Sequence, residues 1–171
     1  VNFFSLNPLD YKLRNGMLKL MTFRTFPRTT GSDFSGEIVA KGESVNNFEI
    51  GEKVFGFLSQ LNEGTSSQFI KVNKSILSKA PTNIDIGKAA AVPLAALTSY
   101  QALVQLAKIK KGNKVLINGA SGGTGIFAIQ IAKIFGAKVT SITSHRNINW
   151  MLDTFLVDEA IDYTKENSLN N

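Results

Sequence analysis

The sequence predicts an α/β protein in which an antiparallel β region is followed by a doubly wound parallel sheet. Three observations support this fold class. Short β-like runs separated by turns fill residues 31–80, alanine-rich helical segments follow over 85–107, and a strand–helix–strand pattern begins at Lys114. With 171 residues and 43% hydrophobic content, the chain has the composition of a globular protein.

The β region contains three predicted strands, in which apolar residues recur or alternate with polar ones, at 34–41, 52–58 and 67–72. Residues 45–51 are rich in turn-forming residues. Asp85 is a predicted helix N-cap, because its side chain can accept a hydrogen bond from a free backbone N–H. Two helical pieces meet at Pro93, since proline suits a first helical turn and breaks a helix interior.

The second region alternates strands with helices. Its predicted strands are 114–118, 138–143 and 159–163, and its predicted helices are 124–135 and 147–156. Gly136 lies where a helix C-cap belongs. This order predicts a parallel sheet built from crossover units.

A glycine-rich turn, Ala120-Ser121-Gly122-Gly123-Thr124-Gly125, joins the first of these strands to its helix. Glycines at 122, 123 and 125 can adopt positive φ or allow backbone and ligand to approach closely. The helix that follows directs free N–H groups and its positive dipole end toward a pyrophosphate. The turn therefore predicts a dinucleotide site; a glycine turn without a ligand is the alternative.

Composition disfavours several other kinds of site. The chain has no cysteine and one histidine, His145, so disulfides and thiolate metal sites are excluded and no metal is expected. No run reaches the ~20 apolar residues of a membrane span. The sequence begins at Val1 without a basic-then-apolar signal region, which predicts a cytoplasmic protein, with a removed targeting segment as the alternative.

The net charge is +6, and the densest group of cations is Lys108, Lys110 and Lys111. Because the cations are otherwise scattered, a solvated surface is favoured over nucleic-acid binding. RNA binding remains a third hypothesis that rests on net charge alone. A positive field would also favour a phosphorylated cofactor.

Several sequence blocks in the expected order resemble the medium-chain dehydrogenase/reductase superfamily, in its zinc-independent quinone and enone oxidoreductase branch. These blocks are Asn7–Gly16, Gly31–Gly36, Gly51–Gly56, Ala91–Tyr100, the glycine turn and Ile161–Tyr163. The resemblance implies a partial GroES-like domain over 1–84, connecting helices over 85–110 and a partial Rossmann-type domain over 111–171. It also implies that the chain is incomplete, lacking about two earlier strands and the later half of the parallel sheet.

In zinc-dependent members of this superfamily, the metal ligands occupy positions that correspond here to Asn7, Ser32 and Leu94. None of the three is a competent zinc ligand in this setting, and the structural zinc lobe is also missing. The resemblance therefore implies hydride transfer to an electron-poor acceptor without a metal.

The preferred cofactor is NADP(H). An NAD site of this fold usually has an acidic residue at the end of the second strand, whereas this strand ends with Ser144, His145 and Arg146. A guanidinium matches a 2′-phosphate well. The resemblance adds Tyr163 to the same phosphate pocket. The alternatives are a helix N-cap for Ser144, a solvated position for Arg146 and a core-edge position for Tyr163.

The resemblance also assigns candidate catalytic residues. Thr98 packs against the nicotinamide ring and Thr124 lies at its other side, while Asn7 and Lys12 line the pocket at the substrate oxygen. Lys12 is the preferred residue for stabilising an oxyanion. The alternatives are a surface position for Lys12 and a core position for the adjacent Tyr11.

Asp33 is a further candidate, either as the residue that orients Lys12 or as a turn stabiliser. Leu156 stands where relatives usually have glycine, so we expect it to take a left-handed conformation at a cost of about 1 kcal/mol.

Two functions remain open at this point. The first is an NADP(H)-dependent, zinc-independent reductase of quinones or α,β-unsaturated carbonyl compounds, acting on a small molecule. The second is a truncated, non-catalytic remnant that at most binds nucleotide or a partner. A homo-oligomer is expected only if the missing half is supplied.

Overall fold

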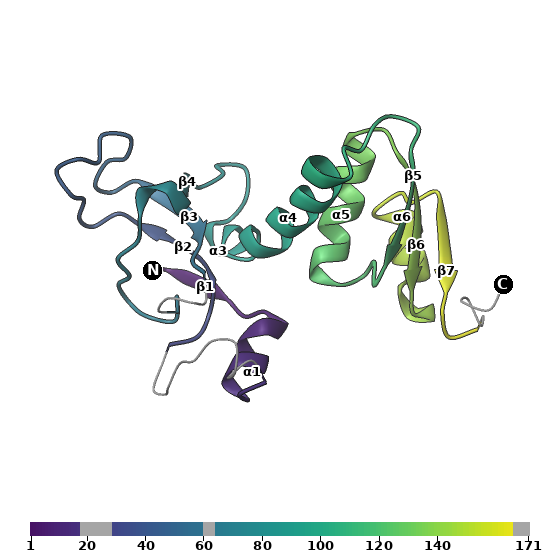
Figure 1. Cartoon of the computed structure of the whole chain (residues 1–171), viewed down its shortest axis with the longest axis horizontal. Coiled ribbons are helices and arrows are strands. Elements are labelled where there is room, and N and C mark those ends of the chain that lie inside the picture. The colour runs from purple at the N-terminus through teal and green to yellow at the C-terminus, as the bar shows by residue number, and fades with distance from the viewer. Residues whose placement is uncertain (18–28, 60–63, 166–171) are drawn as a thin grey trace. The chain divides into compact units, whose positions relative to one another are not determined.

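The computed structural model describes residues 1–17, 29–59 and 64–165 (Figure 1). The chain divides into two compact units, Val1–Leu94 and Ala95–Asn171.

The first unit contains a four-stranded antiparallel sheet with the strand order β1-β2-β3-β4. The strands are β1 (Phe3–Ser5), β2 (Asp33–Glu37), β3 (Lys53–Phe57) and β4 (Leu77–Lys79). Phe34 of β2 is opposite Gly56 of β3. A Cβ at Gly56 would clash with the Ile76 backbone carbonyl oxygen and would meet the Phe34 ring at 3.1 Å, so glycine is needed at this position.

One strand prediction in this unit is wrong. Residues 67–72 form no strand, and β4 follows them instead, after a 3₁₀ turn at Lys74–Ile76. The alternation reflects one-sided burial, because Ile70 and Val72 are half-buried while Phe69 is 71% exposed. Side chains can alternate between buried and exposed positions without backbone pairing in a sheet, so the alternation predicted a strand that does not form. Strand β1 is not predicted by the sequence, and the strand predicted at 34–41 ends at Glu37.

Two short helices flank the sheet. Helix α1 (Pro8–Arg14) begins with proline, and the backbone N–H of the preceding Asn7 donates to Asp10 Oδ2 at 2.7 Å. Helix α3 (Ile86–Ala89) is capped by Asp85, whose Oδ1 accepts from the Gly87 N–H at 2.8 Å. The predicted N-cap is therefore confirmed.

Helix α4 (Pro93–Tyr100) begins at the predicted proline and continues as a π-helical segment, Gln101–Leu106. The Ala107 N–H bonds the Ala102 carbonyl five residues earlier, at 2.9 Å. The division between the two compact units falls within α4, after Leu94, whereas the sequence predicts boundaries after residues 84 and 110. The difference arises because α3 contacts β1 and β2 and so belongs to the first unit.

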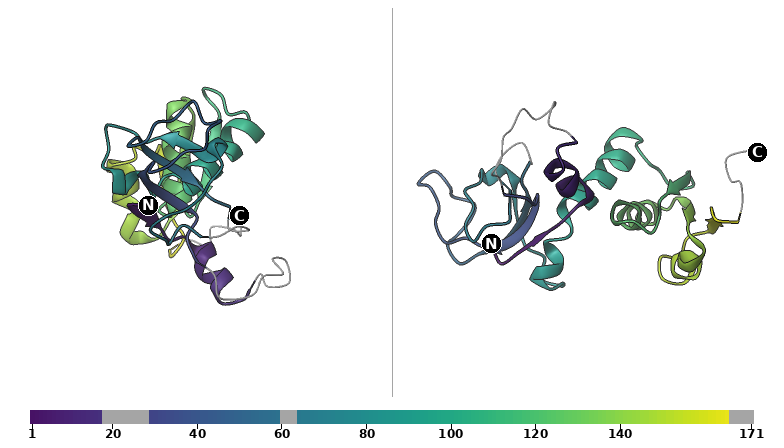
Figure 2. Two further views of the ribbon diagram at one scale, coloured as in Figure 1. Left: turned by 90° about the vertical axis from the view of Figure 1, so that its left-hand side faces the viewer. Right: turned by 90° about the horizontal axis from the view of Figure 1, so that it is seen from below.

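The second unit contains a parallel sheet with the order β5-β6-β7. The elements are β5 (Lys114–Asn118), α5 (Gly123–Ile134), β6 (Lys138–Thr143), a 3₁₀ turn (His145–Asn147), α6 (Ile148–Asp153) and β7 (Glu159–Asp162). Helix α5 contacts β5 and β6, and α6 contacts β7 (Figures 1 and 2). The first two predicted strands are confirmed to the residue, because their runs contain β-branched residues that favour strands.

The core of this unit lies between the helices and the sheet. Its buried members are Ile109, Ile117, Ala120, Ile129, Ala132, Ala137, Val139, Met151 and Val157. Gly136 has φ +73° after α5, as its predicted C-cap position requires. Leu156 has φ 51°, which confirms the expected left-handed conformation, and α6 ends well before it.

Candidate functional site

The glycine turn after β5 is shaped by close packing of backbone. Gly119 has φ +70°, whereas Gly122 has φ −80° and neither Gly123 nor Gly125 has positive φ. A Cβ at Gly125 would lie 2.5 Å from the Gly119 carbonyl oxygen and 2.6 Å from that of Ala120. Gly125 therefore allows the helix to approach the strand, and positive φ is needed at Gly119 rather than at the three predicted glycines.

Gly123 has a different environment. Apart from its own helix and its chain neighbours, nothing lies within 4 Å of a Cβ built there. Gly123 is the first residue of α5, where backbone N–H groups have no partner within the helix. Open space in front of free N–H groups at the end of a long helix suits an anion. The open side of the turn is thus at Gly123, and its packed side is at Gly125, with Gly122 also close to the Gly119 carbonyl oxygen.

Hydrogen bonds connect this turn to the loop after β6. The Thr143 hydroxyl and the Asn147 side-chain amide both donate to Ser121 Oγ at 2.9 Å. The same Asn147 amide donates to Ser144 Oγ at 3.3 Å. Ser121 and Ser144, both predicted residues of the cofactor site, are therefore brought together by Asn147, which the sequence does not indicate.

Helix α4 contacts the turn from another direction. The Ser99 hydroxyl, on a side chain that is 3% exposed, donates to the Thr124 carbonyl oxygen at 2.8 Å. The contact places the adjacent Thr98 on the helix that meets the turn. Thr98 and Thr124 are both exposed, as cofactor contacts require. Ala120 is fully buried and contributes its side chain to the core.

The ends of β6 and β7 carry the remaining predicted residues of the cofactor site. Arg146 is exposed, Tyr163 is 55% exposed, and the Tyr163 N–H donates to the Thr143 carbonyl at 3.2 Å. His145 Nδ1 lies 2.9 Å from Asp162 Oδ2. Hydrogen bonds from Thr164, together with His145, hold the pKa of Asp162 below its ordinary value. The carboxyl ends of neighbouring parallel strands meet at one edge, which is the signal that could have predicted this pair.

The first unit has a buried polar cluster around Asp33, a side chain that is 1% exposed. Asp33 Oδ2 accepts from Asn7 Nδ2 at 2.8 Å and from Ser5 Oγ at 3.0 Å, and Oδ1 accepts from the Leu94 N–H at 2.7 Å. Burial raises the pKa of Asp33, and these three hydrogen bonds oppose the rise. The nearby Asp10 charge raises it further.

Two of the three positions that correspond to zinc ligands belong to this cluster. Asn7 uses its side-chain amide on Asp33, and Leu94 offers only its backbone N–H. Ser32 is fully buried, and its hydroxyl has no hydrogen-bond partner within the described ranges 1–17, 29–59 and 64–165. Among the described residues, no group of three or more acidic or histidine side chains could hold a metal ion.

The other predicted catalytic residues lie on α1. Lys12 is half-buried and Tyr11 is 53% exposed. The hydrogen bonds described for Asp33 go to Ser5, Asn7 and Leu94, and none of them goes to Lys12. Asp33 therefore orients Asn7 rather than Lys12.

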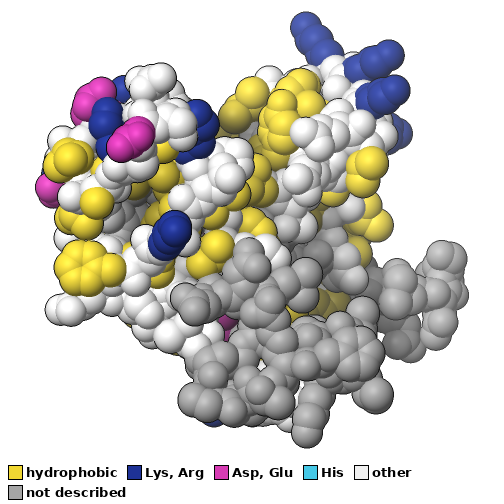
Figure 3. Space-filling view, turned by 60° about the vertical axis from the view of Figure 1, so that its left-hand side comes forward, with side chains coloured by type: hydrophobic (Ala, Val, Ile, Leu, Met, Phe, Trp, Pro, Cys, Tyr) yellow, Lys and Arg dark blue, Asp and Glu magenta, His cyan; other side chains and the backbone are white. Residues whose placement is uncertain are grey.

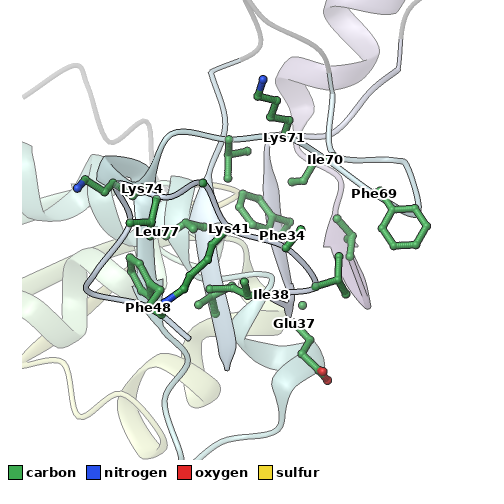
Figure 4. Close-up of a pocket in the computed structure, with 18 residues that line it drawn as sticks. Phe34, Glu37, Ile38, Lys41, Phe48, Phe69, Ile70, Lys71, Lys74 and Leu77 are labelled. Atoms are coloured by element: carbon green, nitrogen blue, oxygen red, sulfur yellow. The ribbon is translucent and has the colours of Figure 1, made fainter. Parts of the chain in front are cut away.

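A cavity of about 650 Å³ lies in the first unit (Figure 4). Its lining includes Phe34, Phe48 and Leu77, with Lys41, Lys71 and Lys74 also present. Because side chains alternate along a strand, Phe34 and Asp33 lie on opposite faces of β2. The cavity is thus separate from the Asp33 cluster, and neither Asn7, Tyr11 nor Lys12 lines it.

The surface shows both apolar and cationic side chains (Figure 3). In the second unit, Leu106 is 81% exposed and Ile134 is 80% exposed. The register of β5 and β6 places Lys114 opposite Lys138, at the edge away from the glycine turn. No helix among the described residues is long and apolar enough to cross a membrane.

The fold and the glycine turn together define a dehydrogenase-like protein that combines an antiparallel β unit with a Rossmann-type unit. Residues 1–82 match the family described as the alcohol dehydrogenase GroES-like domain. The chain belongs to the medium-chain dehydrogenase/reductase superfamily, which confirms the resemblance and the predicted fold class.

Several known proteins are similar to it. The chloroplastic quinone-oxidoreductase homolog of Spinacia oleracea is 36% identical over 164 residues, covering 93% of this chain and 50% of that protein. The 2-methylene-furan-3-one reductase of Solanum lycopersicum is 34% identical, covering 95% of this chain and 43% of that protein. The structure of the quinone oxidoreductase from Coxiella burnetii aligns with a TM-score of 0.88 and 36% identity, over 97% of this chain and 53% of that one.

The chain spans about half the length of the relatives it matches. The first relative is described as chloroplastic, and the cytoplasmic location expected for this chain stays a prediction.

Proposed function

We propose that this chain is part of an NADP(H)-dependent, zinc-independent oxidoreductase that reduces quinones or α,β-unsaturated carbonyl compounds by hydride transfer. The observation that carries the proposal is the difference in packing between two glycines of the turn. Gly125 is closed by packing, while Gly123 is open beside the free N–H groups of α5. A turn without a ligand would need the first feature but not the second.

The residues at the turn fit a dinucleotide. The Gly122 N–H donates to the Gly119 carbonyl at 2.9 Å, so the backbone N–H groups of residues 123–125 would hold the pyrophosphate at the N-terminus of α5. Ala120 anchors the turn by packing in the core. Ser121 fixes the position of the turn relative to the loop after β6. Thr98 and Thr124 would contact the nicotinamide, in keeping with the resemblance.

NADP(H) is favoured over NAD(H) by the residues after β6. No carboxylate follows this strand before α6, so the usual partner of unphosphorylated ribose hydroxyls is lacking there. Ser144 and the exposed Arg146 offer a hydroxyl and a guanidinium to a 2′-phosphate, and Tyr163 lies after the neighbouring strand.

The cofactor, when bound, supplies the hydride. Lys12 would place its ammonium at the substrate oxygen that gains negative charge, and Asn7 would donate a second hydrogen bond there. Asn7 is suited to a fixed role because its backbone N–H is bonded to Asp10 and its side-chain amide to Asp33. Tyr11 lies in α1, four residues after Asn7, and would line the pocket with it.

Metal assistance is not part of this proposal. The positions of Asn7, Ser32 and Leu94 offer an amide already bonded to Asp33, a hydroxyl and an alkyl side chain. These groups make a poor zinc donor set. An activated alkene or quinone accepts hydride at an electron-poor carbon or oxygen and needs only a donor for the resulting oxyanion.

The alternative is that this chain binds nucleotide without turnover. Two measurements separate the proposals, namely fluorescence titration with NADPH and NADH, and NADPH oxidation with a small quinone or an enone. Saturable NADPH binding with turnover supports the enzyme. Binding without turnover of either substrate by the 171-residue chain and by a protein of its relatives' length would favour the alternative.

A matched pair of variants tests the turn itself. Gly123→Ala adds a methyl group where the pyrophosphate would approach, and we expect NADPH affinity to fall about tenfold or more. Gly42→Ala is the control, since Gly42 is equally open and also lacks positive φ. Equal NADPH affinity in both variants would contradict the proposed site.

A further inference from the structure

We propose that His145, held in place by Asp162, contacts the 2′-phosphate of NADPH next to Arg146, so that protonation of its imidazole increases selectivity for NADP(H) over NAD(H). This inference rests on the proposed function. It adds a specificity residue to that site and a dependence on pH.

The strand order places the two residues together. Thr143, the last residue of β6, is opposite Asp162, the last residue of β7. His145 follows β6 by two residues, and its Nδ1 lies 2.9 Å from Asp162 Oδ2. The His145 side chain is 68% exposed, whereas that of Asp162 is 11% exposed. The carboxylate therefore holds the ring from the protein side, and the ring faces solvent.

Asp162 is well suited to anchor a cation. Its other oxygen, Oδ1, accepts from the Thr164 hydroxyl at 2.7 Å and from the Thr164 N–H at 3.0 Å. These bonds, with the bond to His145, lower the pKa of Asp162, so the carboxylate is ionised at neutral pH. With Nδ1 facing this carboxylate, Nε2 is available to a ligand, since the described part of the chain offers it no partner.

His145 lies at the end of the proposed cofactor site where the 2′-phosphate would bind. His145 stands between Ser144 and Arg146 in the turn after β6. Asn147 joins this turn to the glycine turn, because its amide bonds both Ser121 and Ser144. A group recognised by Ser144 and Arg146 would therefore lie beside the exposed imidazole.

The local charge balance explains why protonation matters. The charged or titratable groups nearby are Arg146 on the same turn, and Asp162, Tyr163 and Lys165 at the end of β7. With neutral His145 the histidine–aspartate pair carries one negative charge, which repels a phosphate. With protonated His145 the pair is neutral and adds a donor. NADH lacks the 2′-phosphate, so its affinity should respond little.

The first test uses the fact that His145 is the single histidine of the chain. Its imidazole C–H signals in a proton NMR spectrum are therefore identified without assignment. The pH titration of these signals is recorded for the 171-residue chain alone, with 2′,5′-ADP and with 5′-AMP. We expect 2′,5′-ADP to move the midpoint upward by about one pH unit, which corresponds to tenfold tighter binding of the protonated form. We expect 5′-AMP to leave the midpoint in place.

The second test uses binding to variants. The phosphate itself titrates near pH 6, so each variant is compared with the unsubstituted chain at the same pH. In His145→Gln, the ratio of NADH to NADPH dissociation constants should change less between pH 6 and pH 8 than in the unsubstituted chain. In Arg146→Gln, NADPH affinity should fall at every pH while the dependence on pH is kept.

The outcomes are distinguishable. A midpoint that does not move with 2′,5′-ADP, or that moves equally with 5′-AMP, overturns the role of His145 while NADPH binding still supports the proposed function. If neither the unsubstituted chain nor a protein of its relatives' length binds NADPH or NADH, the proposed function fails and this inference fails with it.

Discussion

The side-chain amide of Asn7 donates to Asp33 Oδ2 at 2.8 Å, across 26 residues of sequence. The backbone N–H of the same asparagine donates to Asp10 Oδ2 at 2.7 Å. Asn7 is thus held by two carboxylates at the start of α1. Its amide orientation follows from the Asp33 contact, because a carboxylate can only accept.

We expect strong coupling between these two residues. Asp33→Ala removes the acceptor of two hydrogen bonds, from the Leu94 N–H and the Asn7 amide, and should lower the free energy of unfolding by about 2–4 kcal/mol. Asn7→Ala should cost about 1–3 kcal/mol. Urea unfolding of both single variants and the double variant gives the coupling energy. Additive losses would show that the contact contributes little.

Ser32 and Ser35 form a matched pair within the same sheet. Both are fully buried, but the Ser35 hydroxyl donates to the Ile86 carbonyl at 2.6 Å, while that of Ser32 has no partner in the part of the chain that the structure describes. We expect Ser35→Ala to cost about 1 kcal/mol and Ser32→Ala to be neutral or stabilising. Denaturant midpoints decide the matter, and an equal loss for Ser32→Ala would reveal an unrecognised partner.

The glycine turn predicts opposite effects on stability at two positions. Gly125→Ala places a methyl group against the carbonyl oxygens of Gly119 and Ala120, and should cost about 1–3 kcal/mol or more. Gly123→Ala has open space and should be neutral or slightly stabilising, because alanine favours a helix. Thermal unfolding of the two variants measures the difference. A Gly125→Ala protein as stable as the unsubstituted chain would contradict the packing described here.

Leu156 is strained by its φ of 51°. Its side chain is 66% exposed, so little packing is lost on truncation. We expect Leu156→Gly to raise the free energy of unfolding by about 1 kcal/mol. Leu152→Gly in α6 is the control and should instead destabilise the chain by about 1 kcal/mol or more. If both variants lose stability alike, the strain at Leu156 is negligible.

Asp158 should make stability depend on acid pH. The Val139 N–H at 2.6 Å and then the Lys133 ammonium at 3.0 Å lower its pKa from the ordinary 3.8. Since the folded pKa is the lower one, the contribution is present above pH 3.8 and is lost as the pH falls through the folded pKa. Unfolding of Asp158→Asn should show reduced stability at pH 7 and a smaller difference at pH 3. A constant difference would rule out this linkage.

The elements that the sequence predicted well have strong local patterns. Strands β5 and β6 are runs rich in β-branched residues that end at turn signals, and helix α4 starts at a proline. Strands β1 and β4 have three residues each, which is too short for a period-two pattern to be recognised. The run at 67–72 has that pattern without a pairing partner in the sheet, so the same reasoning failed there.

The sequence by itself determined the superfamily, the glycine turn and the residues that cap or break the helices, because these depend on neighbours along the chain. Only the tertiary structure decided that Asp33 binds Asn7 and Leu94, which are 26 and 61 residues away. It also decided that His145 meets Asp162, 17 residues on. Such contacts depend on strand register and crossover connections, which local patterns do not specify.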